Sequence, residues 1–230
     1  MPAISRTMAR LMKGRDISIP VNGLQLHGEL ELSPQAIGLV VFAHGSGSSR
    51  HSPRNQYVAR VLQQAEVGTL LFDLLTPEEE QAEARTGRLR FNIPLLAQRL
   101  AAATRWVWDR ETTGDLNTGF FGASTGAAAA LTAAAELGHA INAVVSRGGR
   151  PDLADATLGE VEAATLLIVG GNDTPVLSAN EDAYGRLHCE RALRIVPGAS
   201  HLFAEPGTLE HVARMASDWF AHHLQPMTLR

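Results

Sequence analysis

The sequence predicts an α/β protein, a three-layer sandwich in which helices cover both faces of a central, mostly parallel eight-stranded sheet. Short apolar runs alternate with stretches in which apolar residues recur every three or four positions, as a buried parallel sheet with crossover helices requires. An early Asn-Gly pair lies between two runs of alternating hydrophobicity and predicts an antiparallel hairpin. The chain has 230 residues, of which 45% are hydrophobic, so it can form one sizeable core.

The predicted elements begin with this hairpin. Residues 16–21 and 24–32 alternate apolar and polar side chains, and Asn22-Gly23 favours a tight turn between them. These two strands are expected at an antiparallel edge of the sheet. The other six strands are short apolar or β-rich runs, predicted at residues 39–43, 69–74, 119–122, 143–146, 165–170 and 192–196.

Helices are expected between and after these strands, because apolar residues at helical spacing form one face that must be buried. One of them is rich in alanine and can therefore pack close to the sheet. The four predicted helices comprise residues 57–64, 93–109, 124–137 (the alanine-rich one) and 209–224.

The chain shows no internal division into domains. No repeat, low-complexity tract or Pro/Ser-rich linker interrupts it. Residues 76–90 are acidic and then basic and are predicted to form a mobile surface flap, with the Glu78-Glu79-Glu80 run on a solvated helix face. We therefore expect an N-terminal arm at residues 1–15 and a single domain at residues 16–230.

Composition limits the classes of partner. Lys and Arg total 20 and Asp and Glu total 24, so the net charge of −4 gives no general electrostatic reason to bind nucleic acid or an anionic membrane. No apolar run approaches the roughly 18 residues of a membrane span, and the N-terminal arm lacks the apolar stretch of a secretory signal. The single cysteine, Cys189, cannot form an internal disulfide. We expect a cytoplasmic protein that binds a small molecule, without nucleic-acid or membrane partners. The sequence does not determine the oligomeric state, and a homodimer is one of the alternatives.

The segment Gly122-Ala123-Ser124-Thr125-Gly126 fits the G-x-S-x-G pattern at the junction of a predicted strand and the alanine-rich helix. A serine there occupies a tight, strained turn, and the helix N-terminus directs free N–H groups and the positive end of its dipole toward it. Ser124 is therefore the candidate nucleophile. The alternative is a glycine-flanked helix start in which Ser124 is only the N-cap.

A serine hydroxyl needs a base and a carboxylate that orients the base, in the chain order serine, acid, histidine. Asp173 follows the predicted strand 165–170, and His201 follows the strand 192–196. Because the carboxyl ends of parallel strands meet at one sheet edge, both side chains are expected to lie near Ser124. Taken singly, the alternatives are a helix cap for Asp173 and an ordinary loop histidine for His201.

An oxyanion hole is expected after the strand 39–43, because the small residues there let backbone N–H groups approach a substrate. The candidate donors are the N–H groups of Ser46 and Thr125. His44 and Gly45 are candidate substrate contacts.

A competing interpretation takes the same loop as a dinucleotide-binding fingerprint, with Gly45 and Gly47 as its glycines and Asp73 as the ribose-binding acid. The position of the third glycine is Arg50, which disfavours it. It also gives no role to the candidate nucleophile, acid and base.

Four arginines follow predicted strand ends, and a guanidinium can hold a carboxylate or a phosphate through two parallel hydrogen bonds. We therefore consider them for recognition of an anionic substrate group; the alternative is structural ion pairing, for example with Asp73 or Asp152. The four are Arg50 and Arg54 after one strand and Arg147 and Arg150 after another, of which Arg50, Arg147 and Arg150 are the candidate substrate contacts.

Taken together, His44-Gly45, the turn at Ser124, Gly171-Asn172-Asp173 and Ser200-His201 resemble the α/β-hydrolase superfamily, most closely its dienelactone-hydrolase-like branch. The resemblance covers about residues 16–224 and implies an α/β-hydrolase fold, hydrolysis of esters or related acyl compounds, and no metal or organic cofactor. True dienelactone hydrolases have a cysteine nucleophile and a glutamate beside the oxyanion loop, where this sequence has Ser124 and Gly45. Residues 146–153 also resemble hydrolase-like modules found beside phosphoribosyltransferases.

These features predict an esterase for small or short-chain acyl substrates that works through a Ser-His-Asp triad and an acyl-enzyme. His201 is expected to take the Ser124 proton while Asp173 holds the imidazole. No inserted domain separates the strands 143–146 and 165–170, so only a minimal cap is expected. Two rival functions are an acyltransferase with the same triad and a non-catalytic binding module on the same fold.

Overall fold

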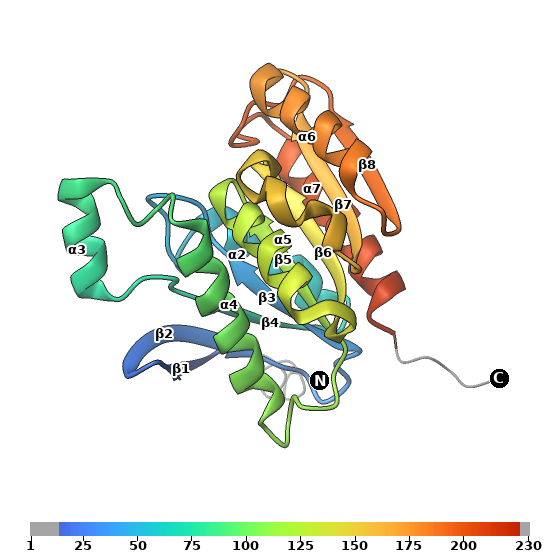
Figure 1. The fold of residues 1–230 in the computed structure, drawn as a ribbon. Helices are drawn as coiled ribbons and strands as arrows, with labels where there is room; N and C mark the ends of the chain where they lie inside the picture. The colour runs from blue at the N-terminus through green and yellow to red at the C-terminus, as the bar shows by residue number, and fades with distance from the viewer. Residues whose placement is uncertain (1–13, 226–230) are drawn as a thin grey trace.

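An eight-stranded sheet runs through the centre of the molecule and carries helices on both faces (Figure 1). The computed structural model describes residues 14–225. The strands are β1 (Arg15–Val21), β2 (Leu24–Glu31), β3 (Gly38–Ala43), β4 (Val67–Phe72), β5 (Thr118–Ala123), β6 (Ile141–Arg147), β7 (Ala164–Gly170) and β8 (Arg191–Val196). The predicted arm at residues 1–15 lies outside the described residues except for its last two, and β1 already begins at Arg15.

The strand order is β1-β2-β4-β3-β5-β6-β7-β8. β1 pairs with β2 and β2 pairs with β4 in antiparallel fashion, whereas every other neighbouring pair is parallel. The predicted α/β class, with its mostly parallel eight-stranded sheet and its antiparallel hairpin at one edge, is confirmed. The sheet is open, and its parallel strands deliver their carboxyl ends to one side of the molecule.

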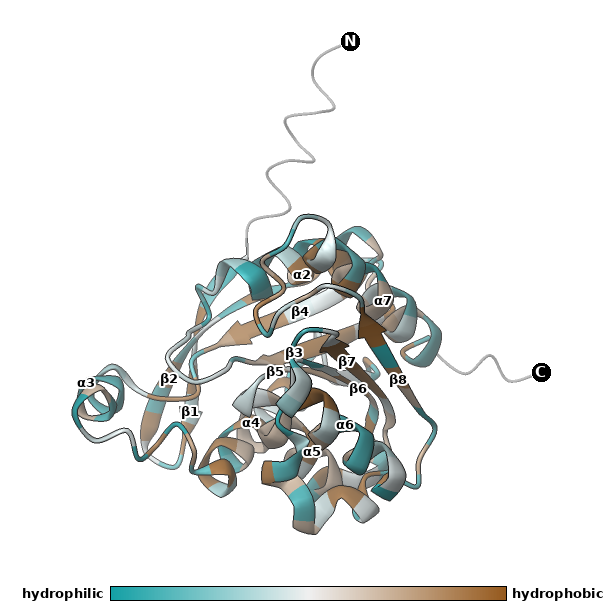
Figure 2. Ribbon diagram, turned by 90° about the horizontal axis from the view of Figure 1, so that it is seen from above, coloured by the Kyte–Doolittle hydropathy of each residue, from teal (hydrophilic) through white to brown (hydrophobic). Residues whose placement is uncertain are grey.

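The helices form two layers. Those in the described part of the chain are α2 (Pro53–Gln64), α3 (Pro77–Thr86), α4 (Ile93–Trp108), α5 (Thr125–Leu137), α6 (Thr174–Arg186) and α7 (Thr208–His223), with short 3-10 segments η1 (Gly138–Ala140) and η2 (Pro151–Glu160). α2 and α7 cover one face of the sheet, and α4, α5 and α6 cover the other (Figure 2). Each face therefore has its own hydrophobic cluster, separated by the sheet.

Several predicted boundaries shift because capping groups, and not apolar residues, begin and end the elements. The helix predicted at 57–64 begins at Pro53, where the Ser52 hydroxyl accepts a hydrogen bond from the Asn55 N–H at 3.4 Å. The strand predicted at 69–74 ends earlier, because the Leu74 N–H turns to donate to a histidine ring.

The sequence prediction missed α6 and η2. In α6 only Val176, Asn180 and Ala183 are buried, so the helix lacks the broad apolar stripe that a periodicity argument needs. Its start, Thr174-Pro175, does place a proline in the first turn, which is a helix signal.

The predicted flap contains α3, which projects from the body of the molecule on the side of β1 and β2 (Figure 1). Glu79 is half-buried and pairs with Arg99 of α4 at 2.5 Å, so the prediction of a solvated face is wrong for this glutamate. Glu83 is buried and pairs with Arg90 at 2.5 Å. The Glu79–Arg99 pair therefore attaches the flap to α4, whereas the Glu83–Arg90 pair lies within the flap.

Within residues 14–225, every helix is too short or too polar to cross a membrane.

Candidate active site

Three side chains from three separate loops meet at the carboxyl edge of the sheet. The His201 Nε2 atom lies 3.2 Å from the Ser124 hydroxyl oxygen, and the His201 Nδ1 atom lies 2.6 Å from the Asp173 carboxylate. Ser124 follows β5, Asp173 follows β7 and His201 follows β8. The imidazole thus bridges a hydroxyl and a carboxylate, as a general base that is oriented by an acid requires.

Ser124 is held in a strained turn. Its φ angle is 51°, in the left-handed region that non-glycine residues rarely occupy, and such a conformation costs about 1–3 kcal/mol. Although Ser124 stands at the N-cap position of α5, its side chain makes no capping hydrogen bond. The helix-cap alternative is therefore wrong for the hydroxyl, which faces the imidazole instead.

The glycines of the G-x-S-x-G segment allow this turn to pack against its neighbours. A Cβ atom at Gly126 would overlap the carbonyl oxygens of Ala43 and His44, and a Cβ atom at Gly122 would overlap the backbone of Ala127. Both obstacles are backbone atoms, which cannot rotate away. Gly126 therefore lets the N-terminus of α5 approach the end of β3, and Gly122 lets the end of β5 pack against the first turn of α5.

Asp173 also stands at a helix start without capping it. Its side chain makes no capping hydrogen bond to α6 and pairs with His201 instead, with 12% of the side chain exposed against 37% for His201. The loop that carries His201 is fixed by Glu205, whose carboxylate accepts a hydrogen bond from the Ser200 N–H at 3.0 Å. This bond lowers the pKa of Glu205, so the carboxylate stays ionised.

The two predicted oxyanion donors contact each other in the structure. The Ser46 N–H donates to the Thr125 hydroxyl at 3.0 Å, and the two side-chain hydroxyls are also 3.0 Å apart. Thr125 is the first residue of α5, where backbone N–H groups have no intrahelical acceptor. The structure thus brings both predicted donors beside the nucleophile, with the Ser46 N–H occupied by a side chain.

His44 fixes the oxyanion loop. Its Nδ1 atom lies 3.0 Å from the Gly45 carbonyl oxygen, which only accepts, and its Nε2 atom accepts from the Leu74 N–H at 3.1 Å. The proton is therefore on Nδ1, and burial lowers the pKa of the ring, which favours the neutral form. Both ring nitrogens are therefore engaged, and the ring ties the loop to the residues that follow β4. The role of His44 as a substrate contact stays a prediction.

Gly45 lies directly against the nucleophile. A Cβ atom there would be 3.0 Å from the Ala123 carbonyl oxygen and 3.1 Å from the Ser124 Cβ atom. A side chain at this position would therefore press on the turn that holds the hydroxyl.

Two of the candidate arginines form local ion pairs. Arg50 binds the Asp73 carboxylate through both its backbone N–H and its guanidinium. Arg150 binds Asp152 with contacts of 2.8 and 2.7 Å. These pairs support the structural alternative for both arginines, and their contact with a substrate stays a prediction. The pairing also occupies both Asp73 oxygens, which argues against a ribose-binding role for that carboxylate.

Arg147 differs from them. It is only 6% exposed, its Nε atom has no hydrogen-bond partner, and its guanidinium lies 5.9 Å from the centre of the Phe203 ring. Burial, and then the nearby Arg54 charge, lower the pKa of Arg147 to about 10. Its carbonyl oxygen accepts the Ser124 N–H at 3.2 Å, so this arginine is a direct neighbour of the nucleophile.

Two small cavities share the oxyanion loop as a wall, since Gly45 and Ser46 line both. One has a volume of about 190 Å³ and is lined by Ser124, His201, Leu202, Arg54 and Arg147, among others. The other has a volume of about 150 Å³ and is lined by Thr125, His44, Leu74, Leu75 and Leu96, among others.

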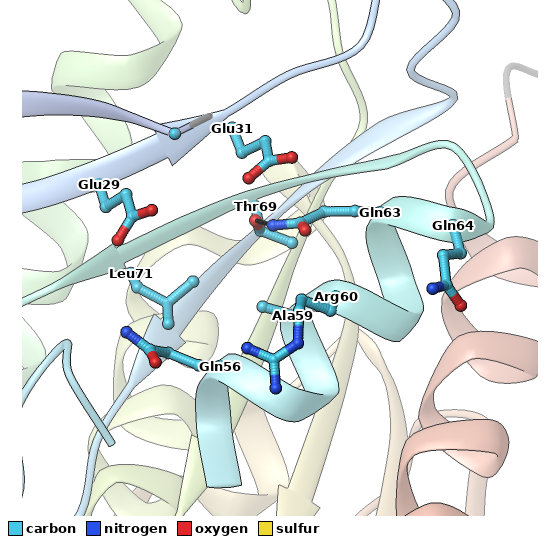
Figure 3. Close-up of a pocket in the computed structure, with 10 residues that line it drawn as sticks. Glu29, Glu31, Gln56, Ala59, Arg60, Gln63, Gln64, Thr69 and Leu71 are labelled. Carbon is cyan, nitrogen blue, oxygen red and sulfur yellow. Dashed lines mark hydrogen bonds between the residues drawn. The ribbon is translucent and has the colours of Figure 1, made fainter. Parts of the chain in front are cut away.

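A larger cavity of about 400 Å³ lies elsewhere, between α2 and the strands β2 and β4 (Figure 3). Gln63 donates to Thr69 at 2.7 Å across it, and burial together with the Glu29 charge raises the pKa of Glu31. None of the predicted site residues lines it. Within residues 14–225, no group of three or more His, Cys, Asp or Glu side chains is arranged to hold a metal ion.

Sequence reasoning did not assign three of these features. The neutral tautomer of His44 and the hydroxyl contact of Thr125 depend on residues distant in sequence. Arg54 was considered for recognition of an anionic group, but its place in the wall of the nucleophile's cavity was not assigned. The signal for Arg54 was local, because it follows Ser52-Pro53 at a helix start that the periodicity argument placed too late.

No family model matches the chain. Two curated proteins from strains of Mycobacterium tuberculosis, each named "Putative phosphoribosyl transferase", are 53% identical over 213 residues, or 93% of this chain. The match covers 47% of those proteins, so the chain spans about half the length of the curated relatives it matches.

Solved structures give a fuller match. A dienelactone hydrolase from Anabaena variabilis is 55% identical, with a TM-score of 0.92, and the match covers 94% of this chain and 100% of that chain. Est1E from Butyrivibrio proteoclasticus is 14% identical, with a TM-score of 0.77 and coverage of 90% and 98%. At that identity the second likeness is one of fold alone.

Proposed function

Because the chain belongs to the dienelactone-hydrolase-like branch of the α/β-hydrolase superfamily, we propose that it is a serine hydrolase that cleaves carboxylic esters with small or short acyl groups. The likeness to a dienelactone hydrolase over the whole length of that chain supports hydrolase activity. Fold alone does not define chemistry, so the argument for the reaction rests on the site.

One observation carries the proposal: the His201 imidazole bridges the Ser124 hydroxyl and the Asp173 carboxylate, at 3.2 and 2.6 Å. Neither Ser124 nor Asp173 uses its side chain to cap the helix that it precedes. Both side chains are thus withheld from the structural role that their positions offer. This arrangement is typical of nucleophilic acyl transfer.

In the first half of the proposed reaction, the Ser124 hydroxyl oxygen attacks the ester carbonyl carbon while His201 Nε2 takes its proton. Asp173 accepts the Nδ1–H hydrogen bond and stabilises the imidazolium that forms. The tetrahedral intermediate collapses, the alcohol leaves with the proton from His201, and the acyl group remains on the serine. In the second half a water molecule attacks the acyl carbonyl carbon while His201 takes its proton. His201 then returns this proton to the Ser124 oxygen as the acid leaves.

The negative charge on the tetrahedral intermediate requires nearby hydrogen-bond donors. We assign this role to the backbone N–H groups of Thr125 and Ser46. The Ser46 N–H is held by the Thr125 hydroxyl at 3.0 Å, so rotation of the Thr125 side chain must accompany binding of the oxyanion. Small-ester specificity is supported by the two cavities beside this loop, of about 190 and 150 Å³.

The first test is labelling with a fluorophosphonate, compared between the natural protein and Ser124→Ala, with mass spectrometry of the modified peptide. We expect modification at Ser124 and turnover of 4-nitrophenyl esters that is greatest for acetate or butyrate. In Ser124→Ala we expect turnover to fall by about 10³-fold or more, with an unchanged circular dichroism spectrum.

The rival functions give different results in the same experiment. Retained turnover in Ser124→Ala would contradict the assigned nucleophile, and a folded protein without serine reactivity would favour a binding module. An added acceptor that outcompetes water in the product mixture would indicate an acyltransferase. The name of the M. tuberculosis relatives describes proteins about twice as long, and the geometry that carries this proposal is one of acyl transfer.

A further inference from the structure

Two guanidinium groups line the cavity beside the nucleophile without a matching carboxylate. Among residues 14–225, neither Arg54 nor Arg147 forms an ion pair, and the Nε atom of each is buried without a hydrogen-bond partner. Buried guanidinium groups are normally paired, because desolvation of an unpaired charge is costly. The cavity therefore holds positive charge that no carboxylate among residues 14–225 neutralises through an ion pair.

The two arginines also lie close enough to repel each other. Burial and then the Arg54 charge lower the pKa of Arg147 only to about 10, so the Arg147 guanidinium is cationic at neutral pH. Arg54 stands in the first turn of α2, beside the capping Ser52, and both residues line the same cavity. The positive end of the α2 dipole adds to the charge at this point.

We propose that Arg54, Arg147 and the N-terminus of α2 form a subsite for a phosphate monoester group on the ester substrate. Two uncompensated positive charges and a helix N-terminus match a dianion better than a single carboxylate, and the planar guanidinium binds phosphate oxygens in pairs. The subsite lies beside the scissile bond, because Ser124 and His201 line the same cavity and the Arg147 carbonyl accepts the Ser124 N–H.

This inference rests on the proposed ester hydrolysis and deepens it, since it assigns a substrate class: small esters whose acyl or alcohol part carries a phosphate. The neighbouring Arg50 and Arg150 are excluded from this role because their guanidinium groups already bind Asp73 and Asp152. Of the four arginines that follow these two strand ends, the subsite thus consists of the two that form no ion pair with a described residue.

The test compares two esters that differ only in phosphate, 1-acetylglycerol and 1-acetylglycerol 3-phosphate, by titration of the released acetic acid. We expect kcat/KM to be about tenfold or more higher for the phosphorylated ester. Arg54→Gln should abolish most of this preference, read as the ratio of kcat/KM for the two esters within each protein. Arg147→Lys, which keeps the charge but removes the fork, should weaken it partly.

Arg60→Gln is the matched control, because it removes one positive charge from the same helix at an exposed position outside this cavity. It should leave the preference unchanged. Equal kcat/KM for the two esters, or a preference that survives in Arg54→Gln, would overturn the subsite. Stronger competitive inhibition by glutarate than by inorganic phosphate would overturn the assignment of phosphate.

Failure of the hydrolase proposal is separable from failure of the subsite. A natural protein that does not hydrolyse 4-nitrophenyl acetate contradicts the hydrolase, whatever the arginines do. Binding of inorganic phosphate, followed by calorimetry in the natural protein and in Arg54→Gln, then tests the subsite without turnover. Equal phosphate affinity in the two proteins would overturn it. If Arg147→Lys lowers the melting temperature strongly, the comparison of the natural protein with Arg54→Gln still tests the subsite, because Arg54 is partly exposed.

Discussion

At the scale of single residues, the site depends on glycines that make room for close backbone contacts, and on helix-start residues whose side chains do not cap their helices. Ser124 has an unfavourable φ angle, and its hydroxyl makes no capping hydrogen bond to the N-terminus of α5. The free energy that holds it in this state comes from the packing around it, above all where α5 meets the end of β3. Gly126 is the contact point, since its missing side chain leaves room for two carbonyl groups.

We therefore expect Gly126→Ala to destabilise the fold severely, because its Cβ atom would overlap backbone oxygens of Ala43 and His44. The measurement is the melting temperature together with the urea midpoint. Gly185→Ala is the control: it adds the same atom to a helix where nothing lies within 4 Å, and should be neutral or stabilising by about 0.5–1 kcal/mol. Similar stability of the two variants would contradict this account of the turn.

At the scale of elements, the flap is the part whose attachment is electrostatic. The Glu79 carboxylate binds both terminal nitrogens of Arg99 at 2.5 Å and accepts the Thr76 N–H at 2.8 Å. Arg99 is buried and also donates to the Leu74 carbonyl at 2.7 Å. This one ion pair therefore connects α3 to α4 and to the end of β4.

Glu79→Gln should lower the free energy of unfolding at pH 7 by about 1.5–3 kcal/mol, because it leaves the buried Arg99 without its charge partner. The hydrogen bond from Arg99 lowers the pKa of Glu79 below its ordinary value of 4.5. The carboxylate thus contributes stability above pH 4.5 and loses it as pH falls through the lowered pKa. The difference between the variant and the natural protein should therefore shrink in acid.

Urea unfolding at pH 7 and at several values below pH 4.5 measures this effect. Glu78→Gln is the control, because Glu78 stands on the same helix and is exposed. A pH-independent difference for Glu79→Gln would contradict an electrostatic attachment of the flap.

At the scale of the whole molecule, the sheet divides the core into two clusters. Phe220 of α7 is fully buried on one face, and Leu100 of α4 is fully buried on the other. Side chains on opposite faces share no packing partners across the buried strands. Small losses of volume on the two faces should therefore act independently.

We expect Phe220→Leu and Leu100→Val each to cost about 1–2 kcal/mol, and the double variant to lose their sum within about 0.5 kcal/mol. The control pair is Phe42→Leu and Phe121→Leu, whose rings lie 4.9 Å apart on one face and should not be additive. Equilibrium urea unfolding gives all the values. A coupling between Phe220 and Leu100 as large as that of the control pair would contradict the division of the core.

The sequence by itself determined the α/β class, the hairpin edge and the chain order of the three side chains that meet at the sheet edge. Those inferences depended on local information: hydrophobic periodicity, a turn dipeptide, and a glycine-flanked serine between a strand and a helix. Because parallel strands deliver their carboxyl ends to one edge, local placement was enough to bring Ser124, Asp173 and His201 together.

Only the tertiary structure decided which polar groups pair with other groups of the protein and which are left to bind a substrate. Arg50 and Arg147 look alike in sequence, yet one meets Asp73 and the other is buried without an acid. The Nε2 atom of His44 accepts a hydrogen bond from the N–H of Leu74, thirty positions away. The Ser46 N–H donates to the hydroxyl of Thr125 at the start of α5. The physical reason is that periodicity and propensity act between chain neighbours, whereas the pairing of charges and hydrogen bonds depends on which distant segments the packed sheet places in contact.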